Sequence, residues 1–426
     1  MKNYQISSEL HSFCRTFERD LTKPQMGRVK EMIHGIIRGK KAFLNTIANQ
    51  NRGKDGKVIR RQAQQYSNML LNLPLGMMIF RKLKAFKREI DSNTPIYIDL
   101  VDITKKYHKG MECIGQTWDG SEGEPGKGYE IIDVSIKKGN ECMTLYRHMF
   151  STAEEDYKGE VDEFEKVLNR LGEAWGEVRG TLFVDTGGDN RKKINKLLDY
   201  ETGFVVRMNV NRGDRDRVLF DEEKQKTKMM ALWNKPQGFT VWKDKKEKKT
   251  KVVQLQWRKV CWEYEKELIP MYLVWAHREG DPSPVVFLTT RKIENEATAE
   301  KVYHQYFGRG SEEAVFKCHK EKLGMEKVRL RSFEKVKKLM MVYVLVDQLL
   351  TKLKSEATKL GTLLNMLLKS FLKGTQRIIG KWSVIDWYDD YYKNPERETV
   401  RFRRRYPPPE AIFQASLFPN LRKNGE

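Results

Sequence analysis

The hydrophobic pattern divides the chain into a helical region at its amino-terminal end and a longer region in which strands alternate with helices. Between residues 8 and about 92, apolar positions recur every three or four residues, as they do on one face of an α-helix. Pro24 is favoured in the first turn of such a helix and Gly39 at its end. Further helical patterns cover 42–48 and 77–90. We therefore predict several helices in this region.

The pattern changes at Asn93, where β-branched and aromatic residues begin to dominate the apolar runs. Such runs predict buried strands, and stretches of helical spacing between them predict helices that cover a sheet. The predicted strands are 93–102, 129–136, 142–147, 180–185, 204–209, 253–258, 271–275 and 285–289, and the predicted helices are 161–175, 192–198 and 330–350. This order of elements predicts an α/β fold.

Composition indicates a globular protein with a polyanionic partner. A chain of 426 residues with 39% hydrophobic content can bury a large core, and its length suits two or three domains. The formal net charge is +22, which favours nucleic acid as the partner. Residues 1–94 contain 19 Lys and Arg against 7 Asp and Glu, so a surplus of 19 − 7 = 12 positive charges lies there.

The helix predicted at 77–90 has the clearest basic face. Its apolar residues are interleaved with Arg81, Lys82, Lys84, Lys87 and Arg88. A face of this kind can lie along the phosphates of DNA, or it can simply be solvated. The residues alone leave both interpretations open.

The cysteines and the apolar runs bear on the compartment. Cys14, Cys113, Cys142, Cys261 and Cys318 show no paired spacing, so we expect reduced thiols and neither a disulfide framework nor a zinc site. The first residues lack the apolar core of a signal peptide, and the longest apolar run, 339–346, is too short to cross a membrane. We expect a cytoplasmic protein without a membrane partner.

Acidic residues follow two of the predicted strands. The strand at 93–102 leads to Asp99 and Asp102, which face opposite sides of a strand, so we expect only one of them in a site. Asp185 follows the strand that begins at Gly180 and precedes two glycines. An aspartate before glycines is commonly a turn residue, but strand ends are also where open α/β sheets place their chemistry.

A further polar group follows the last predicted strand. Tyr306, Arg309, Glu313 and Lys320 are spaced so that one continuous helix would carry them on one face. Helix-spaced ion pairs are also ordinary on a solvated surface, so this geometry does not establish a site. Ser311 is a good N-cap, and a helix that began there would keep only Glu313 and Lys320 on that face.

The spacing Tyr-x2-Arg-x3-Glu-x6-Lys resembles the signature of DDE transposases of bacterial insertion sequences of the IS-four type, and the order strand-Asp, strand-Asp, helix-Glu is similar as well. This resemblance implies a ribonuclease H-like catalytic domain with a β-rich insertion, preceded by an all-helical DNA-binding domain. The implied domains are a helical DNA-binding domain (1–92), the two parts of the catalytic domain (93–212 and 285–360), the β-rich insertion (213–284) and a helical, basic tail (361–426).

The resemblance also implies the chemistry. Asp99, Asp185 and Glu313 become the catalytic residues and the ligands of two Mg²⁺ ions, for which Mn²⁺ can substitute, and Asp99 is favoured over Asp102. Converging carboxylates suit this task, because Mg²⁺ prefers oxygen ligands and two such ions can clamp the attacking and leaving oxygens of a phosphodiester. No histidine or cysteine is required.

The partners follow from the same resemblance. Tyr306, Arg309 and Lys320 become DNA contacts. The DNA is double-stranded and comprises the terminal inverted repeats of the element and a target, with a homodimer holding two ends together at the nucleoid. An aromatic residue of the insertion stacks on a displaced base in this family. The candidates are Trp242, Trp257, Trp262 and Trp275, and for each the alternative is packing in the core.

The predicted function is therefore DNA cleavage and strand transfer by a transposase. One alternative is a nuclease of the same fold that cleaves without joining. Another is a catalytically silent DNA-binding protein derived from a transposase, although all the signature residues are present. A basic RNA-binding protein is a third, but nothing in the chain resembles an RNA-binding module.

Overall fold

A computed structural model describes residues 6–52, 55–105, 109–119, 123–138, 141–176, 180–200, 202–210, 219–244, 249–368 and 384–385. The chain separates into two compact units. The first consists of 1–74, 315–329 and 334–426, and the second of 75–314 and 330–333.

The regular elements described in the first unit are all helices or helical turns. Its helices are α1 (Ile6–Arg15), α2 (Lys23–Gly39), α3 (Leu44–Arg52), α4 (Gly56–Asn72), the end of α9 (Gly310–Lys317), a π-helical turn (Cys318–Lys322), a 3-10 turn (Met325–Lys327) and α10 (Phe333–Leu368). Thr22 and Gln25 form a capping box that starts α2, with Pro24 in its first turn. Asp55 caps α4. The predicted helices at 24–39 and 42–48 are confirmed, whereas α4 was not predicted.

Helix α5 (Leu75–Phe86) opens the second unit and is followed by a 3-10 turn (Lys87–Glu89), so the helix predicted at 77–90 is shorter than expected. It packs against α6 (Glu160–Trp175), where the indole of Trp175 donates a hydrogen bond of 2.6 Å to the carbonyl of Leu83. Arg81 and Lys84 remain exposed. The apolar face of α5 is thus buried while much of its basic face is accessible.

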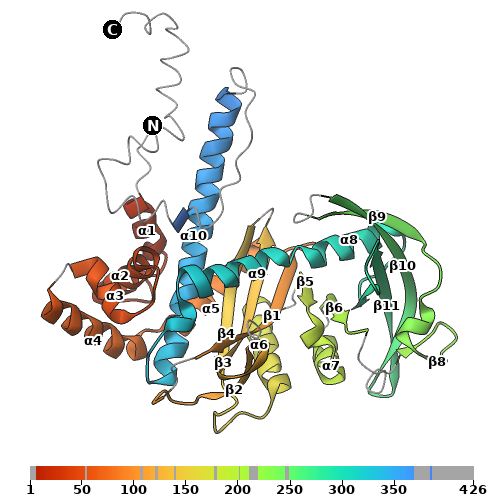
Figure 1. The fold of residues 1–426 in the computed structure, drawn as a ribbon, viewed down its shortest axis with the longest axis horizontal. Helices are drawn as coiled ribbons and strands as arrows, with labels where there is room; N and C mark the ends of the chain where they lie inside the picture. Colours follow the sequence, from red (N-terminus) through yellow and green to blue (C-terminus); the bar gives the residue numbers. More distant parts are fainter. Residues whose placement is uncertain are drawn as a thin grey trace, which may run out of the picture. The chain divides into compact units, whose positions relative to one another are not determined.

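The described strands of the second unit form one 12-stranded mixed sheet (Figure 1). Its order is β2-β3-β1-β5-β6-β12-β11-β10-β7-β8, with β4 paired to β3 and β9 to β10. The bounds are β1 (Pro95–Thr104), β2 (Gly115–Asp119), β3 (Glu124–Lys138), β4 (Glu141–Phe150), β5 (Thr181–Val184), β6 (Phe204–Met208), β7 (Leu219–Phe220), β8 (Lys226–Thr227), β9 (Gly238–Asp244), β10 (Lys249–Tyr264), β11 (Glu267–Arg278) and β12 (Val285–Thr289). Strand β1 runs antiparallel to β3 and parallel to β5, and β5 runs parallel to β6.

The two faces of the central strands have different roles. One face joins the main core with α6 and α7 (Arg191–Asp199), and its residues include Ile96, Ile98, Leu182, Val184, Val167, Leu168 and Ile194. The other face carries Tyr97 and Phe183, whose ring centroids lie 5.7 Å apart. Because side chains alternate along a strand, Asp99 shares the face of Tyr97 and points away from the main core.

The β-rich insertion predicted at 213–284 extends this same sheet. Strand β10 pairs with β11, and β11 pairs with β12, so the strands of the insertion continue outward from the central strands (Figure 1). Trp262 and Trp275 are fully buried in the sheet, which supports core packing for both. Trp242 and Trp257 are partly exposed.

The signature does not lie on one continuous helix. Helix α8 (Glu296–Phe307) ends at Phe307, α9 begins at Gly310, and the last turn is π-helical. Of the two arrangements that the sequence left open, one continuous helix is therefore excluded, and the start of α9 at Gly310 is close to the alternative start at Ser311. A Cβ at Gly308 would lie 2.6 Å from the phenol oxygen of Tyr97, so a glycine is required where the two helices meet.

Some predicted features lie outside the described residues. These are the residues of the predicted tail beyond Leu368, except for 384–385. Among the helices that are described, none combines the length and the apolar character that a bilayer span would need.

Candidate active site

The register of two parallel strands places Asp99 beside Asp185. Ile98 of β1 pairs with Val184 of β5, and each aspartate is the next residue along its strand. Pairing between the two strands stops at this point, while β1 continues to Thr104 along its other neighbour, β3. Asp99 was predicted at the end of its strand. It lies instead inside β1, at the point where the parallel pairing with β5 stops. The carboxyl side of parallel strands thus supplies both acids.

Asp102 does not join this group. It lies three residues further along β1, so its side chain points to the opposite face of the sheet from Asp99. It is paired in register with Glu130 of β3 and accepts a hydrogen bond of 3.2 Å from the hydroxyl of Thr104. The sequence left open whether Asp99 or Asp102 belongs to the site. The structure places Asp99 beside Asp185.

The meeting point of α8 and α9 supplies the remaining groups. Tyr306 lies in the last turn of α8, Arg309 lies between the helices, and Glu313 lies in the first turns of α9. A capping box of Asn295 and Thr298 begins α8 and satisfies backbone N–H groups at the start of the helix. Although the helix is broken at Gly308, Tyr306, Arg309 and Glu313 still converge.

Arg309 is the centre of the arrangement. Its guanidinium lies 2.8 Å from Oδ2 of Asp185, 3.6 Å from Oδ2 of Asp99 and 3.3 Å from Oε1 of Glu313. Tyr306 donates a hydrogen bond of 2.6 Å to Oδ1 of Asp185. Five residues that are separated by up to 313 − 99 = 214 positions thus meet in one polar cluster. The exposed fraction of the side chain rises from 10% for Arg309 to 64% for Glu313, so the cluster opens toward solvent at Glu313.

Burial and charge shift the pKa values in this cluster in different directions. The pKa of Asp99 is raised to about 6, chiefly by burial and also by the carboxylates of Asp185 and Asp133, against the lowering effect of Arg309. Burial acts in the same sense on Asp185, but Arg309 and the hydrogen bond from Tyr306 outweigh it and lower its pKa. Burial favours loss of the charge on Arg309, yet Asp99 and Asp185 raise its pKa.

Three residues near this site were missed in the sequence. Asp133 pairs with Asp99 across β1 and β3, and its carboxylate lies 2.7 Å from the guanidinium of Arg147 in a pair that is almost fully buried. Arg207 lies 3.9 Å from Asp185 and is more exposed. The signal for Asp133 was an acidic residue inside an otherwise apolar strand, since buried charges are rarely retained without a partner.

Lys320 lies in the first unit. Its ammonium is 2.8 Å from Glu326, and 16% of its side chain is exposed. The residues that the structure gathers around Arg309 are therefore three of the four signature residues and the two strand acids.

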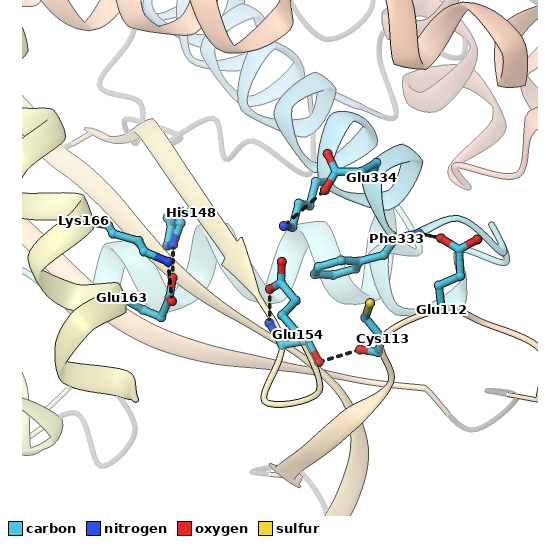
Figure 2. A network of polar contacts seen from close by, with 10 residues as sticks. Glu112, Cys113, His148, Glu154, Glu163, Lys166, Phe333 and Glu334 are labelled. Atoms are coloured by element: carbon cyan, nitrogen blue, oxygen red, sulfur yellow. Dashed lines mark hydrogen bonds and ion pairs between the residues drawn. The ribbon is translucent and has the colours of Figure 1, made fainter. Parts of the chain in front are cut away.

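A second polar network binds α6 to the sheet. Figure 2 shows the carboxylate of Glu163 between His148 of β4 and Lys166, at 2.6 and 2.7 Å. Hydrogen bonds from these two partners lower the pKa of Glu163, against its burial. In the same view Glu112 accepts a hydrogen bond of 3.0 Å from the backbone of Phe333 at the start of α10. These contacts satisfy buried charge and a helix end, and so serve packing.

The donor types around Arg309 suit a hard divalent cation. Mg²⁺ is usually held by one or two carboxylates together with substrate phosphate and water, and here three carboxylates already face one cationic group. In the described part of the chain, no three His, Cys, Asp or Glu side chains stand close enough to hold a metal as they are placed. The carboxylates therefore fit such an ion in chemistry, while their present spacing fits the guanidinium.

The fold and the cluster define a class of protein. Such a protein has a mixed sheet with helices, two carboxylates where the pairing of parallel strands ends, and a further carboxylate from a helix. Comparison with protein families names that class more closely. The model of the family described as "Transposase DDE domain" matches residues 154–346, which supports a DDE transposase. The match includes Asp185, Arg309 and Glu313 and begins after Asp99. No curated protein matched the chain.

Proposed function

We propose that this protein is the DNA transposase of an insertion sequence, and that it cuts the ends of its element and joins them to target DNA with the help of divalent metal ions. The observation that carries the proposal is the convergence of Asp99, Asp185 and Glu313 on Arg309, of which Asp185 and Glu313 lie in the part of the chain that matches the transposase DDE domain. Water is the nucleophile for cleavage in this scheme, and the freed 3′-hydroxyl is the nucleophile for joining.

The strand arrangement supports a ribonuclease H-like catalytic domain. In the order β4-β3-β1-β5-β6, the pairs β4–β3 and β3–β1 are antiparallel, and the pairs β1–β5 and β5–β6 are parallel. Helices α6 and α7 pack on the core face of these strands. In this proposal β7 to β11 are the insertion, and the catalytic carboxylates come from β1, the end of β5 and α9. The IS-four signature explains the spacing of the last group.

In the proposed mechanism Asp99, Asp185 and Glu313 bind Mg²⁺ or Mn²⁺. The metal supplies activation of the attacking oxygen and stabilisation of the leaving oxygen. Arg309 binds a phosphate of the DNA strand, because its planar guanidinium matches two phosphate oxygens. Tyr306 holds Asp185 in place through its hydrogen bond of 2.6 Å. Lys320 provides a further positive charge for the backbone.

The basic surfaces support DNA as the substrate. The helical region 1–92 is proposed to bind the terminal inverted repeats, and the exposed cations of α5, such as Arg81 and Lys84, are available to phosphates. Trp242 and Trp257 remain candidates for stacking on a displaced base. Two ends must be held together for transposition, so we propose a homodimer that acts on DNA in the cytoplasm, at the nucleoid.

Cleavage of DNA tests the proposal. The substrate is a labelled fragment that carries the sequences flanking the gene on both sides, incubated with Mg²⁺ and either the natural protein or Glu313→Gln. This substitution keeps the size of the side chain and removes the charge that a metal needs. Glu321→Gln is the matched control, because Glu321 pairs with Lys317 outside the cluster.

We expect the natural protein and Glu321→Gln to cut the fragment, and Glu313→Gln to bind it without cutting. Cutting by all three proteins would contradict the role of Glu313. Binding without cutting by any of them would favour the catalytically silent DNA-binding protein, and cutting without a joined product would favour the nuclease.

A further inference from the structure

Arg309 neutralises the very carboxylates that the proposed metal ions require. Its guanidinium lies 2.8 Å from Asp185, 3.3 Å from Glu313 and 3.6 Å from Asp99. It is a buried residue, with 8% of its surface exposed. One fixed cation thus satisfies acids from β1, β5 and α9 together.

A guanidinium and a divalent cation cannot occupy this point together. Each would need the same carboxylate oxygens, and two cations a few ångströms apart repel each other, most strongly at the buried end of the cluster around Arg309. The present spacing of the acids suits the guanidinium, since no three metal-binding side chains among the described residues are placed to hold an ion. Metal binding therefore requires that Arg309 first moves away from the acids.

We propose that Arg309 is an internal counter-ion that competes with divalent metal for Asp99, Asp185 and Glu313, and that a DNA phosphate draws it away. This inference rests on the proposed function, because it concerns the same carboxylates. It adds a coupling: the metal binds weakly until DNA is present, and DNA and metal then strengthen each other's binding. Such coupling would keep the protein from cutting DNA before an end is seated.

The position of Arg309 between two helices bears on this movement. Its backbone N–H donates a hydrogen bond to the carbonyl of Tyr306 and its carbonyl accepts one from the N–H of Glu313, so the side chain and not the backbone is the part that moves. A Cβ at Gly310 would meet nothing within 4 Å, so there is open space beside Gly310, the residue after Arg309. A phosphate is also a strong competitor for the guanidinium, because it offers two oxygens in the geometry of the arginine fork.

Direct measurement of Mn²⁺ binding tests the inference without any need for activity. Isothermal titration calorimetry gives the Kd for Mn²⁺ of the natural full-length chain, Arg309→Gln and Arg309→Lys. Arg207→Gln is the matched control, because it removes an arginine that lies 3.9 Å from Asp185 and makes no recorded contact with the other two acids. Asp185→Asn shows whether Mn²⁺ binds at these carboxylates at all.

We expect Arg309→Gln to bind Mn²⁺ at least about tenfold more tightly than the natural chain, because a competing unit charge is removed at close range. Arg309→Lys should fall between the two, and Arg207→Gln should change the Kd by less than about threefold. Thermal unfolding followed by tryptophan fluorescence, with and without Mn²⁺, confirms that each variant folds. Arg309→Gln should show the larger increase in melting temperature on adding Mn²⁺.

The same titration with DNA carrying the flanking sequences tests the coupling. DNA should tighten Mn²⁺ binding by the natural chain and have a much smaller effect on Arg309→Gln. If Asp185→Asn abolishes Mn²⁺ binding but Arg309→Gln binds Mn²⁺ no more tightly than the natural chain, the counter-ion role is wrong and the proposed function stands. If Asp185→Asn binds Mn²⁺ as the natural chain does, the carboxylates are not the metal site, and the proposed function fails with the inference.

Discussion

The Asp99→Asn substitution should stabilise the protein at neutral pH in the absence of metal. The pKa of Asp99 is about 6 in the folded protein against an ordinary 3.8, a rise of about 2.2 units. At 1.36 kcal/mol per unit this corresponds to ~3 kcal/mol as an upper limit. Because the folded pKa is raised, the folded state loses stability as pH rises from 3.8 through about 6. Asparagine resembles the protonated acid and escapes this loss.

Chemical denaturation in EDTA measures the effect. Seven of the nine tryptophans lie in the second unit, so their fluorescence chiefly reports unfolding around the site. We expect Asp99→Asn to exceed the natural chain in free energy of unfolding by up to ~3 kcal/mol at pH 8 and to match it near pH 4. A difference that is equal at both pH values, or a loss at pH 8, would refute the reasoning.

Asp185→Asn should change the free energy of unfolding in the opposite direction from Asp99→Asn. The pKa of Asp185 is lowered, so its ionised form stabilises the folded state above the ordinary pKa, and this stability is lost as pH falls through the lowered value. We expect Asp185→Asn to be less stable than the natural chain at pH 8 and to approach it in acid.

Two further predictions concern packing beside the site. Gly308→Ala should lower the melting temperature, because its Cβ would lie 2.6 Å from the phenol oxygen of Tyr97. The Cβ of Gly310→Ala would meet nothing within 4 Å, so this variant should keep the natural melting temperature or raise it. Equal melting temperatures for the two variants would contradict the close approach at Gly308. Arg147→Met should cost about 3–5 kcal/mol of unfolding free energy at pH 8, since it leaves the buried carboxylate of Asp133 without its partner, and denaturation that showed no loss would disprove the importance of that pair.

Much of the sheet could be predicted, because buried strands correspond to short apolar runs in the sequence. The strands at 181–184, 204–208 and 285–289 were placed to within a residue or two, since each is a mainly apolar run that ends at polar residues. The order of acids along the chain then placed Asp185 correctly after its strand. What the pattern could not give was the register between β1 and β5, which sets Asp99 beside Asp185 and depends on contacts across 86 residues (185 − 99).

The signature region shows the limit of periodicity. Its spacing is compatible with one helix, but α8 ends at Phe307 and α9 begins at Gly310, on either side of the close approach of Gly308 to Tyr97. The residues nonetheless converge, because Arg309 is drawn to the acids of β1 and β5 by charge. The partner of a charged side chain is set by tertiary structure, and for the same reason the buried pair of Asp133 and Arg147 was not foreseen.

The central claim is that Asp99, and not Asp102, completes a carboxylate site that cuts DNA with metal ions. Its most direct test is cleavage of the flanking DNA with Mg²⁺ by Asp99→Asn and Asp102→Asn, which remove the same charge from opposite faces of one strand. We predict that Asp99→Asn binds this DNA without cutting it, while Asp102→Asn cuts at close to the natural rate. Cutting by Asp99→Asn, or its loss only in Asp102→Asn, would contradict the account.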